Sequence, residues 1–163
     1  MTALALTRIE DALAHVPSAV AAVAAMVDGA PEGLVATSLS VGASFDPPLV
    51  MLAVREASTT WPLLRTSPRI GVSMLAEAQA AATHRLASRT RHRRFEGLAR
   101  EEREGGAVLL RGSSLRFECS VHAETPAGDH RVVLLRVHSL EVDPAVEPLV
   151  YHRSGFRALR DAG

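Results

Sequence analysis

The stretch 114-SLRFECSVHAETPAGDHRVVLLRVHSLEV-142 decides the fold. Apolar residues occupy the odd positions from Leu115 to Ala123, and polar residues occupy the even positions between them. This two-residue period is typical of a strand with one buried face. Residues 131–142 are apolar on both faces at their centre, and residues 125–130, TPAGDH, are rich in turn formers. The stretch therefore predicts two long strands joined by a turn.

The rest of the chain continues this pattern, with short helices inserted between strands. We expect residues 33–45 to form a strand and the loop after it, and residues 88–106 to form a polar surface loop with a helical turn. Strands are predicted over residues 18–27, 49–54 and 69–75, and helices over residues 4–15, 60–66 and 77–87. Strands with inserted rather than alternating helices favour an antiparallel barrel. No repeat, linker or second domain interrupts residues 1–163, so we expect a single domain.

Composition excludes several classes of function. The formal net charge is zero, with 18 basic and 18 acidic residues, so no bulk field favours nucleic acid or an anionic membrane. The longest apolar run, residues 19–27, is too short to span a bilayer, and we expect no secretory signal, because the first residues lack a basic region followed by an apolar core. The sequence contains no lysine, which excludes a Walker phosphate loop, a kinase lysine and a Schiff-base cofactor. No metal-binding motif is present. The single cysteine, Cys119, fits a reducing cytoplasm.

Two clusters of hydroxyl side chains are candidates for a binding site. Ser58, Thr59 and Thr60 follow the apolar strand over residues 49–54, where a helix is expected to begin. They are interpreted either as helix caps, because Ser and Thr are favoured there, or as a seat for a phosphate group. The second cluster lies on the strand and loop over residues 33–45. Its hydroxyls need partners, either the backbone or a polar planar ligand, and its members are Thr37, Ser38, Ser40 and Ser44.

Several sequence blocks, in this order, resemble the flavin reductase family. The blocks are DPPLV, STTWPLL, LASRTRHRRFEG, AGDHRVVLLRV and EPLVYHRSGFRAL, and the resemblance runs from about residue 8 to residue 157. It implies a mainly β fold, the Greek-key split β-barrel of the FMN-binding type. One departure is Gly42, which adds a residue before Asp46 and predicts a bulge.

The resemblance also implies a flavin-binding site. Thr37 and Ser38 would contact the isoalloxazine edge, together with Ser40 and Ser44. Ser58, Thr59 and Thr60 would bind the flavin phosphate or ribityl chain. The further residues implied are Ser88, Arg89, Arg94 and Phe95 near the phosphates, Gly128, Asp129 and His130 beside the flavin and nicotinamide rings, and Tyr151 near the active site. His130 is the expected catalytic residue, although the same GDH turn could simply close a hairpin.

The implied function is an NAD(P)H:flavin oxidoreductase. It would transfer a hydride from NADH or NADPH to FAD or FMN and supply reduced flavin to a flavin-dependent monooxygenase. The cofactors perform the difficult chemistry, so no nucleophile or general base is required. The resemblance further implies a homodimer. The alternatives are a non-catalytic flavin-binding split barrel and a split-barrel oxidase acting on a pyridoxine phosphate. The second of these is disfavoured by the GDH turn and the absence of lysine.

Overall fold

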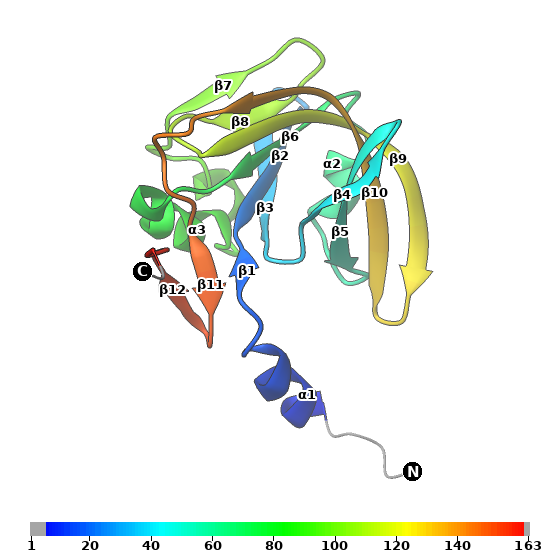
Figure 1. Ribbon diagram of the computed structural model, residues 1–163. Helices are drawn as coiled ribbons and strands as arrows, with labels where there is room; N and C mark the ends of the chain where they lie inside the picture. Colours follow the sequence, from blue (N-terminus) through cyan, green and yellow to red (C-terminus); the bar gives the residue numbers. More distant parts are fainter. Residues whose placement is uncertain (1–5, 162–163) are drawn as a thin grey trace.

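Strands dominate the structure, a computed structural model that describes residues 6–161. Its main sheet has seven strands in the order β3-β2-β6-β9-β10-β5-β4, and every neighbouring pair is antiparallel. The sheet curls into a barrel with β3 and β4 as its two edges (Figure 1). The mainly β class with inserted helices is therefore confirmed.

The strands and helices have the following bounds. The main sheet consists of β2 (Ala21–Val27), β3 (Ala30–Ala36), β4 (Ser40–Phe45), β5 (Pro48–Arg55), β6 (Ile70–Met74), β9 (Leu115–Ala127) and β10 (His130–Val142). The smaller sheets consist of β1 (Ser18–Ala19), β11 (Val150–His152) and β12 (Gly155–Arg157), and of β7 (Arg100–Glu102) and β8 (Val108–Leu110). The helices are α1 (Leu6–Leu13), α2 (Trp61–Leu64) and α3 (Ala80–Leu86), with the 3₁₀ turns η1 (Glu77–Gln79) and η2 (Arg91–Arg93).

The β9–β10 hairpin is the longest element and confirms the two strands predicted from the alternation. The turn is tighter than predicted, because β9 continues to Ala127 and only Gly128 and Asp129 connect the strands. Gly128 has φ +65°, a left-handed conformation that favours glycine. Pro126 fits in the strand because β6 pairs with β9 only as far as Cys119. Beyond that residue one edge of β9 is open, and a missing N–H there breaks no ladder.

Strand β2 separates two hydrophobic cores. Its alternate residues Ala21, Val23 and Ala25 pack into the core inside the barrel, with Leu52, Ile70 and Leu135 among others. Ala22 and Ala24 face the opposite way, into a second core that includes Leu86, Phe95 and Leu110. The five residues from Ala21 to Ala25 are each at most 1% exposed. Small side chains on both faces let β2 lie between two layers of close packing.

Two segments differ from the sequence expectation. The strand predicted within residues 33–45 is broken, because β3 ends at Ala36 and β4 begins at Ser40. The register of β4 against β5 shifts between Ser40 and Ser44, where Gly42 has φ +72°, so the predicted bulge is present. Residues 88–106 are not all loop, since β7 pairs with β8. The charged composition of β7 hid this strand from a reading based on hydrophobicity.

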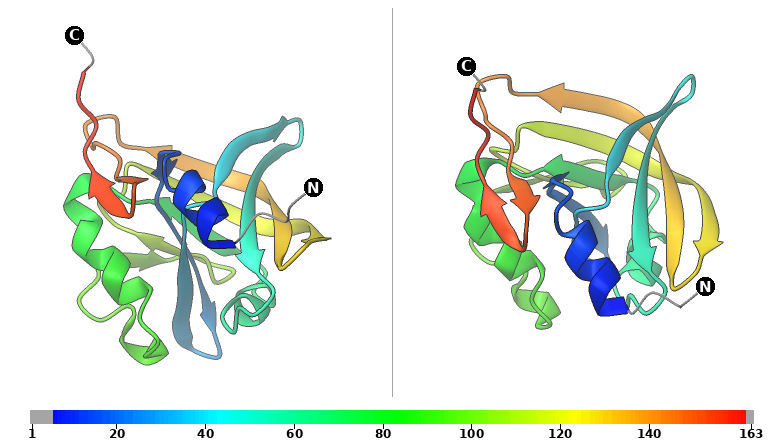
Figure 2. Two further views of the ribbon diagram at one scale, coloured as in Figure 1. Left: turned by 90° about the horizontal axis from the view of Figure 1, so that it is seen from below. Right: turned by 60° about the horizontal axis from the view of Figure 1, so that its bottom comes forward.

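The amino-terminal helix projects from the barrel on the side of the last hairpin, and most of its described side chains are exposed (Figure 1). The predicted helix spans residues 4–15, of which residues 4 and 5 lie outside the described part of the chain; the structure ends α1 at Leu13. The Arg153 N–H donates to the Ala14 carbonyl at 2.7 Å, and His152 Nε2 lies 3.2 Å from the His15 carbonyl oxygen. These contacts connect the end of α1 to the β11–β12 hairpin (Figure 2).

Candidate functional site

A cavity of about 470 Å³ opens between the ends of β3, β5 and β10. The cavity forms where the chain leaves β3 and crosses to β4. Residues 37–39 of this crossing lie beside the last residues of β5. Its walls are mostly apolar, with a few polar side chains at one end. The lining residues are Leu34, Val35, Ala36, Thr37, Ser38, Ala53, Val54, Arg55, Ala57, Ser58 and His130.

The crossing segment is held to β5 by Ser38. Its hydroxyl donates to the Ala53 carbonyl at 2.9 Å and accepts from the Ala53 N–H at 3.0 Å. Ser38 therefore uses its hydroxyl on the backbone and positions the wall of the cavity. Thr37 lines the same cavity and is exposed. Its hydroxyl is the one in this segment that can turn toward a ligand.

The Ser58–Thr60 cluster divides into three different environments. Ser58 lines the cavity and accepts a hydrogen bond from the Trp61 N–H at 3.1 Å, so it caps the α2 turn while its own O–H stays free to donate. Thr59 is exposed. Thr60 is buried, and its Oγ1 accepts from Arg94 Nη1 at 2.9 Å. The cap interpretation therefore applies to Ser58, the phosphate interpretation stays a prediction, and Thr60 is part of the packing behind Ser58.

Arg94 is not among the residues that line the cavity, and two of its three guanidinium nitrogens donate to protein groups. Its Nε donates to the Ser88 carbonyl at 2.7 Å, and its Nη1 donates to the Gly33 carbonyl at 2.7 Å as well as to Thr60. Burial lowers the pKa of this guanidinium, partly offset by the charge of Glu32. Arg94 thus connects the loop before η2, strand β3 and the start of α2. The geometry does not place its donors in the cavity.

His130 stands at the cavity rim with its orientation fixed. Its Nδ1 lies 2.7 Å from Asp129 Oδ1, so the Asp129 contact leaves Nε2 available to a ligand. This hydrogen bond and the charge of His130 lower the pKa of the Asp129 carboxyl, with a smaller contribution from Arg55. Asp129 itself is 87% exposed in its side chain. Gly128 provides the turn that brings both residues to this position.

The other residues predicted from the resemblance lie away from the cavity. Ser40 is exposed on β4 and Ser44 lies beyond the Gly42 bulge. Ser88 caps its own loop by accepting from the Thr90 N–H at 3.1 Å, and Arg89 is exposed. Phe95 is in the second core, and Tyr151 packs on Phe156 with ring centres 5.7 Å apart. The structure thus brings together Thr37, Ser38, Ser58 and His130 in one cavity.

Arg55 is a cavity residue that the sequence reasoning missed. It is the last residue of β5, and it is the direct cross-strand partner of His130 on β10. The available signal was its place three residues before Ser58, the first residue of the hydroxyl cluster, at the end of a buried strand. No cluster of side chains able to hold a metal ion occurs within the described residues 6–161, and no helix in that range is long and apolar enough to cross a membrane.

The fold and cavity define a split-barrel protein with a mostly apolar cavity at the ends of its strands. Comparison with known proteins makes this class specific. Residues 13–160 match the model of the flavin reductase like domain. This chain belongs to the flavin reductase family.

Three relatives illustrate the match. The reductase component of 4-hydroxyphenylacetate 3-monooxygenase from Thermus thermophilus is 37% identical over 151 residues, which cover 92% of this chain and 94% of the relative. The NADH-dependent FMN reductase AsuE2 of Streptomyces nodosus subsp. asukaensis is 31% identical over 162 residues, with coverages of 95% and 85%. The structure of the NADH:FAD oxidoreductase SgcE6 of Streptomyces globisporus C-1027, in complex with NAD and FAD fragments, superposes with a TM-score of 0.88 at 26% identity, covering 96% and 94%.

Proposed function

We propose that this chain is an NAD(P)H:flavin oxidoreductase that supplies reduced flavin to a partner monooxygenase. The observation that carries the proposal is the cavity in which an oriented imidazole, two free hydroxyl donors and apolar strand ends converge. Relatives of this chain include the reductase component of a monooxygenase and NADH-dependent reductases of FMN and FAD. Family and geometry therefore support the same reaction class.

The cavity fits a flavin by size and by chemistry. Its volume of about 470 Å³ is within the range of about 300–1,000 Å³ that is usual for small-molecule sites. Leu34, Val35 and Val54 offer apolar surface for a ring system, and the ends of β3 and β5 offer backbone groups beside it. Thr37 and Ser58 offer hydroxyls for the polar edge and the ribityl chain. No lysine or metal is required.

The protein residues in this proposal bind, orient and exclude water. A bound flavin supplies the hydride-accepting chemistry. The apolar wall lowers the water content of the cavity, Ser38 fixes the segment that carries Thr37, and Asp129 fixes the His130 ring. His130 Nε2 is then available to hydrogen-bond the nicotinamide amide or the flavin. No group on the protein must give or take a proton in the hydride step, so this chemistry requires only binding and orientation from the cavity residues.

The direct experiment mixes the protein with NADH and either FMN or FAD and follows NADH oxidation. Turnover with either flavin supports the reductase. Flavin binding without NADH oxidation would leave a non-catalytic flavin-binding barrel. The variant His130→Gln is expected to raise the KM for NADH more than it changes flavin affinity. Unchanged NADH kinetics would show that His130 does not contribute to the site.

We also propose a homodimer, located in the cytoplasm where reduced nicotinamide nucleotides are available. Exposed apolar side chains support the pairing, because β4 is an edge strand and its Phe45 is 88% exposed beside exposed Val41. Analytical ultracentrifugation at micromolar concentration tests this state. Phe45→Glu is expected to shift the protein toward monomer, and a wild-type protein that sediments as a monomer would contradict the proposal.

A further inference from the structure

A buried carboxylate on β9 lies near the cavity without lining it. The side chain of Glu124 is only 7% exposed. Glu124 is directly opposite the core residue Val133 of β10, so both side chains leave the core face of the sheet. The alternation in the sequence would put Glu124 on the opposite face, but the register shifts at His122 and reverses the phase. Bulges at the rims of barrels often redirect one side chain in this way.

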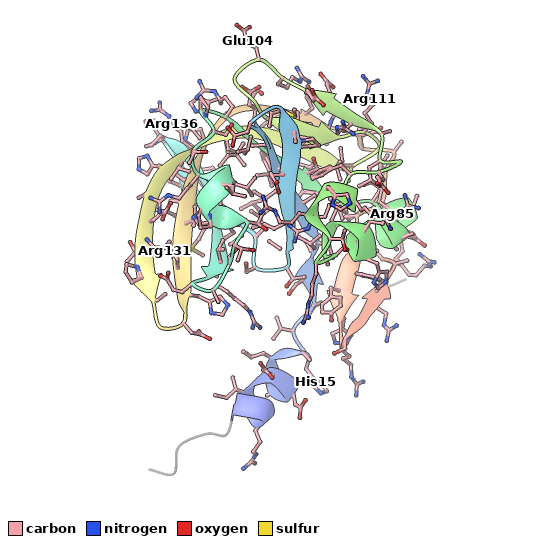
Figure 3. The ribbon with its side chains drawn as sticks, turned by 180° about the vertical axis from the view of Figure 1, so that it is seen from behind. His15, Arg85, Glu104, Arg111, Arg131 and Arg136 are labelled. Carbon is pink, nitrogen blue, oxygen red and sulfur yellow. The ribbon has the colours of Figure 1, made fainter. Side chains whose placement is uncertain are left out.

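Arg131 connects this buried carboxylate to the segment after β5. Arg131 lies on β10 (Figure 3), two residues before Val133, so its side chain is on the core face as well. Its Nη1 lies 3.1 Å from Glu124 Oε2, and its Nη2 lies 3.0 Å from Glu56 Oε1. One guanidinium therefore bridges β9 and residues 56–60, the segment that carries Ser58 into the cavity.

A second arginine completes the arrangement at the end of α2. Arg65 Nε lies 3.3 Å from Glu124 Oε1, in a geometry that makes an ion pair and no hydrogen bond. The Glu56 N–H also donates to the carbonyl of Asp129 in the β9–β10 turn at 3.0 Å. We call the four charged side chains of Glu56, Arg65, Glu124 and Arg131 the rim cluster. They hold both ends of the segment between β5 and the end of α2 against the β9–β10 hairpin.

The rim cluster is poorly suited to stabilise the fold. The side chains of Glu56 and Arg65 are 44% and 49% exposed, and exposed ion pairs contribute little to stability. For the buried Glu124, the loss of hydration offsets much of the attraction to arginine, and apolar side chains of the same size would pack as well. Charges held between fixed partners instead select one relative position of the segments that carry them.

We infer that Arg131 and Glu124 are positioning residues for the cavity, and that they fix the Ser58 segment relative to the turn that carries His130. The inference rests on the proposed function. Neither residue lines the cavity, whereas Ser58 and His130 both do. If the segment can shift, the two polar groups no longer meet a ligand in one arrangement. Binding then weakens although every cavity residue is still present.

The kinetic test uses Arg131→Met, which keeps the length of the side chain and removes its charge. In variant protein that circular dichroism shows to be folded, the KM for NADH is expected to rise about fivefold. In the His130→Gln background the same substitution is expected to change this KM by less than about twofold, because Arg131 acts through His130. A merely structural role would instead multiply the two losses, and that result overturns the inference.

Two further variants support this comparison. Glu56→Gln removes one arm of the rim cluster at an exposed position, so it tests the inference even if Arg131→Met does not fold. It is expected to raise the KM for NADH in the same direction by a smaller factor, and no change would count against the inference. Arg136→Met is the matched control with no expected effect. It removes the same charge from an exposed position on β10 (Figure 3), five residues and so about 17 Å away along the strand.

Hydrogen exchange gives a readout that needs no activity. The Glu56 amide is expected to exchange about tenfold faster in Arg131→Met, because its bond to Asp129 loosens. The core amide of Leu135 is expected to change less. Equal increases at both amides would show global destabilisation alone, and this result, or unchanged exchange at Glu56, overturns the inference. Failure of the wild-type protein to oxidise NADH with any flavin overturns the proposed function instead, and the exchange rates still decide whether Arg131 fixes this segment.

Discussion

Replacing Arg94 with glutamine separates a structural from a ligand-binding arginine. The guanidinium makes three hydrogen bonds, to the carbonyls of Ser88 and Gly33 and to the Thr60 hydroxyl. These bonds connect three segments that do not otherwise share a strand. Glutamine is shorter and uncharged, so Arg94→Gln removes all three bonds and leaves the two carbonyls without this donor.

The expected cost follows from the bonds. A hydrogen bond to a charged group contributes about 1.5–3 kcal/mol. The three contributions do not add fully, because they share one side chain and water can reach the partly exposed site. We expect the free energy of unfolding to fall by about 3 kcal/mol. With a urea m-value of about 2 kcal/mol/M, the midpoint moves down by about 1.5 M.

Urea unfolding followed by circular dichroism measures this shift. Arg93→Gln is the matched control, because it removes the same charge from the neighbouring, exposed residue and is expected to change stability by less than about 0.5 kcal/mol. Thr60→Val removes one of the three bonds and is expected to cost about 1 kcal/mol. A midpoint unchanged in Arg94→Gln, together with a large loss of FMN affinity, would refute this reasoning and return Arg94 to the phosphate role that the family resemblance implies.

Three further outcomes are expected. Gly71→Ala lowers the free energy of unfolding by about 2–3 kcal/mol in urea melts, because its Cβ would lie 2.1 Å from the Val108 carbonyl oxygen. Native protein does not react with a thiol reagent at pH 8, because burial raises the pKa of Cys119 to about 12; labelling at the rate of a free thiol would contradict this. His130→Gln raises the pKa of Asp129 in a carboxyl NMR titration, because the hydrogen bond that lowers it is lost. With its folded-state pKa lowered, Asp129 stabilises the fold above pH about 4, and this contribution is lost as the pH falls.

The first two of these expectations have a control, and the third has an outcome that would contradict it. Gly155→Ala places a Cβ at 3.4 Å from the flexible Arg157 guanidinium rather than against backbone, and its stability is expected to change by less than about 0.5 kcal/mol. Denatured protein reacts with the thiol reagent at once, which shows that folding protects Cys119. If the pKa of Asp129 does not change in His130→Gln, the contact between His130 and Asp129 is not the cause of the lowered pKa.

Hydrophobic alternation was sufficient for the β9–β10 hairpin and insufficient for the break between β3 and β4 and for the charged strand β7. The β9–β10 hairpin was predictable because one face of β9 alternates into the core, and Phe117 and Cys119 are indeed buried. Strand β7 was not predictable, because all of its residues, Arg100 to Glu102, are charged and no apolar residue alternates with them. Such a strand is recognisable only from its pairing with β8, which is a property of the fold.

The candidate site was predictable in part, through the family resemblance. Two of the hydroxyl residues that follow a strand, Thr37 and Ser58, line the cavity, and their roles as flavin contacts stay predictions. The direction of a loop side chain is not encoded locally, however. Phe95 turns inward because Gly33 leaves room for its ring, and a Cβ on that glycine would lie 2.6 Å from Phe95 Cζ. Arg94 turns inward with it, whereas Arg55 stays at the cavity because its strand ends there.

The position of β2 between the two cores determines how the protein unfolds. The alternate side chains of β2 belong to opposite hydrophobic clusters. Neither cluster can therefore open without exposing one face of β2 to water. Local opening of α1 leaves β2 intact, so the amides of the buried residues Ala21–Ala24 become accessible to deuterium only through the global transition. The two clusters therefore behave as a single cooperative unit.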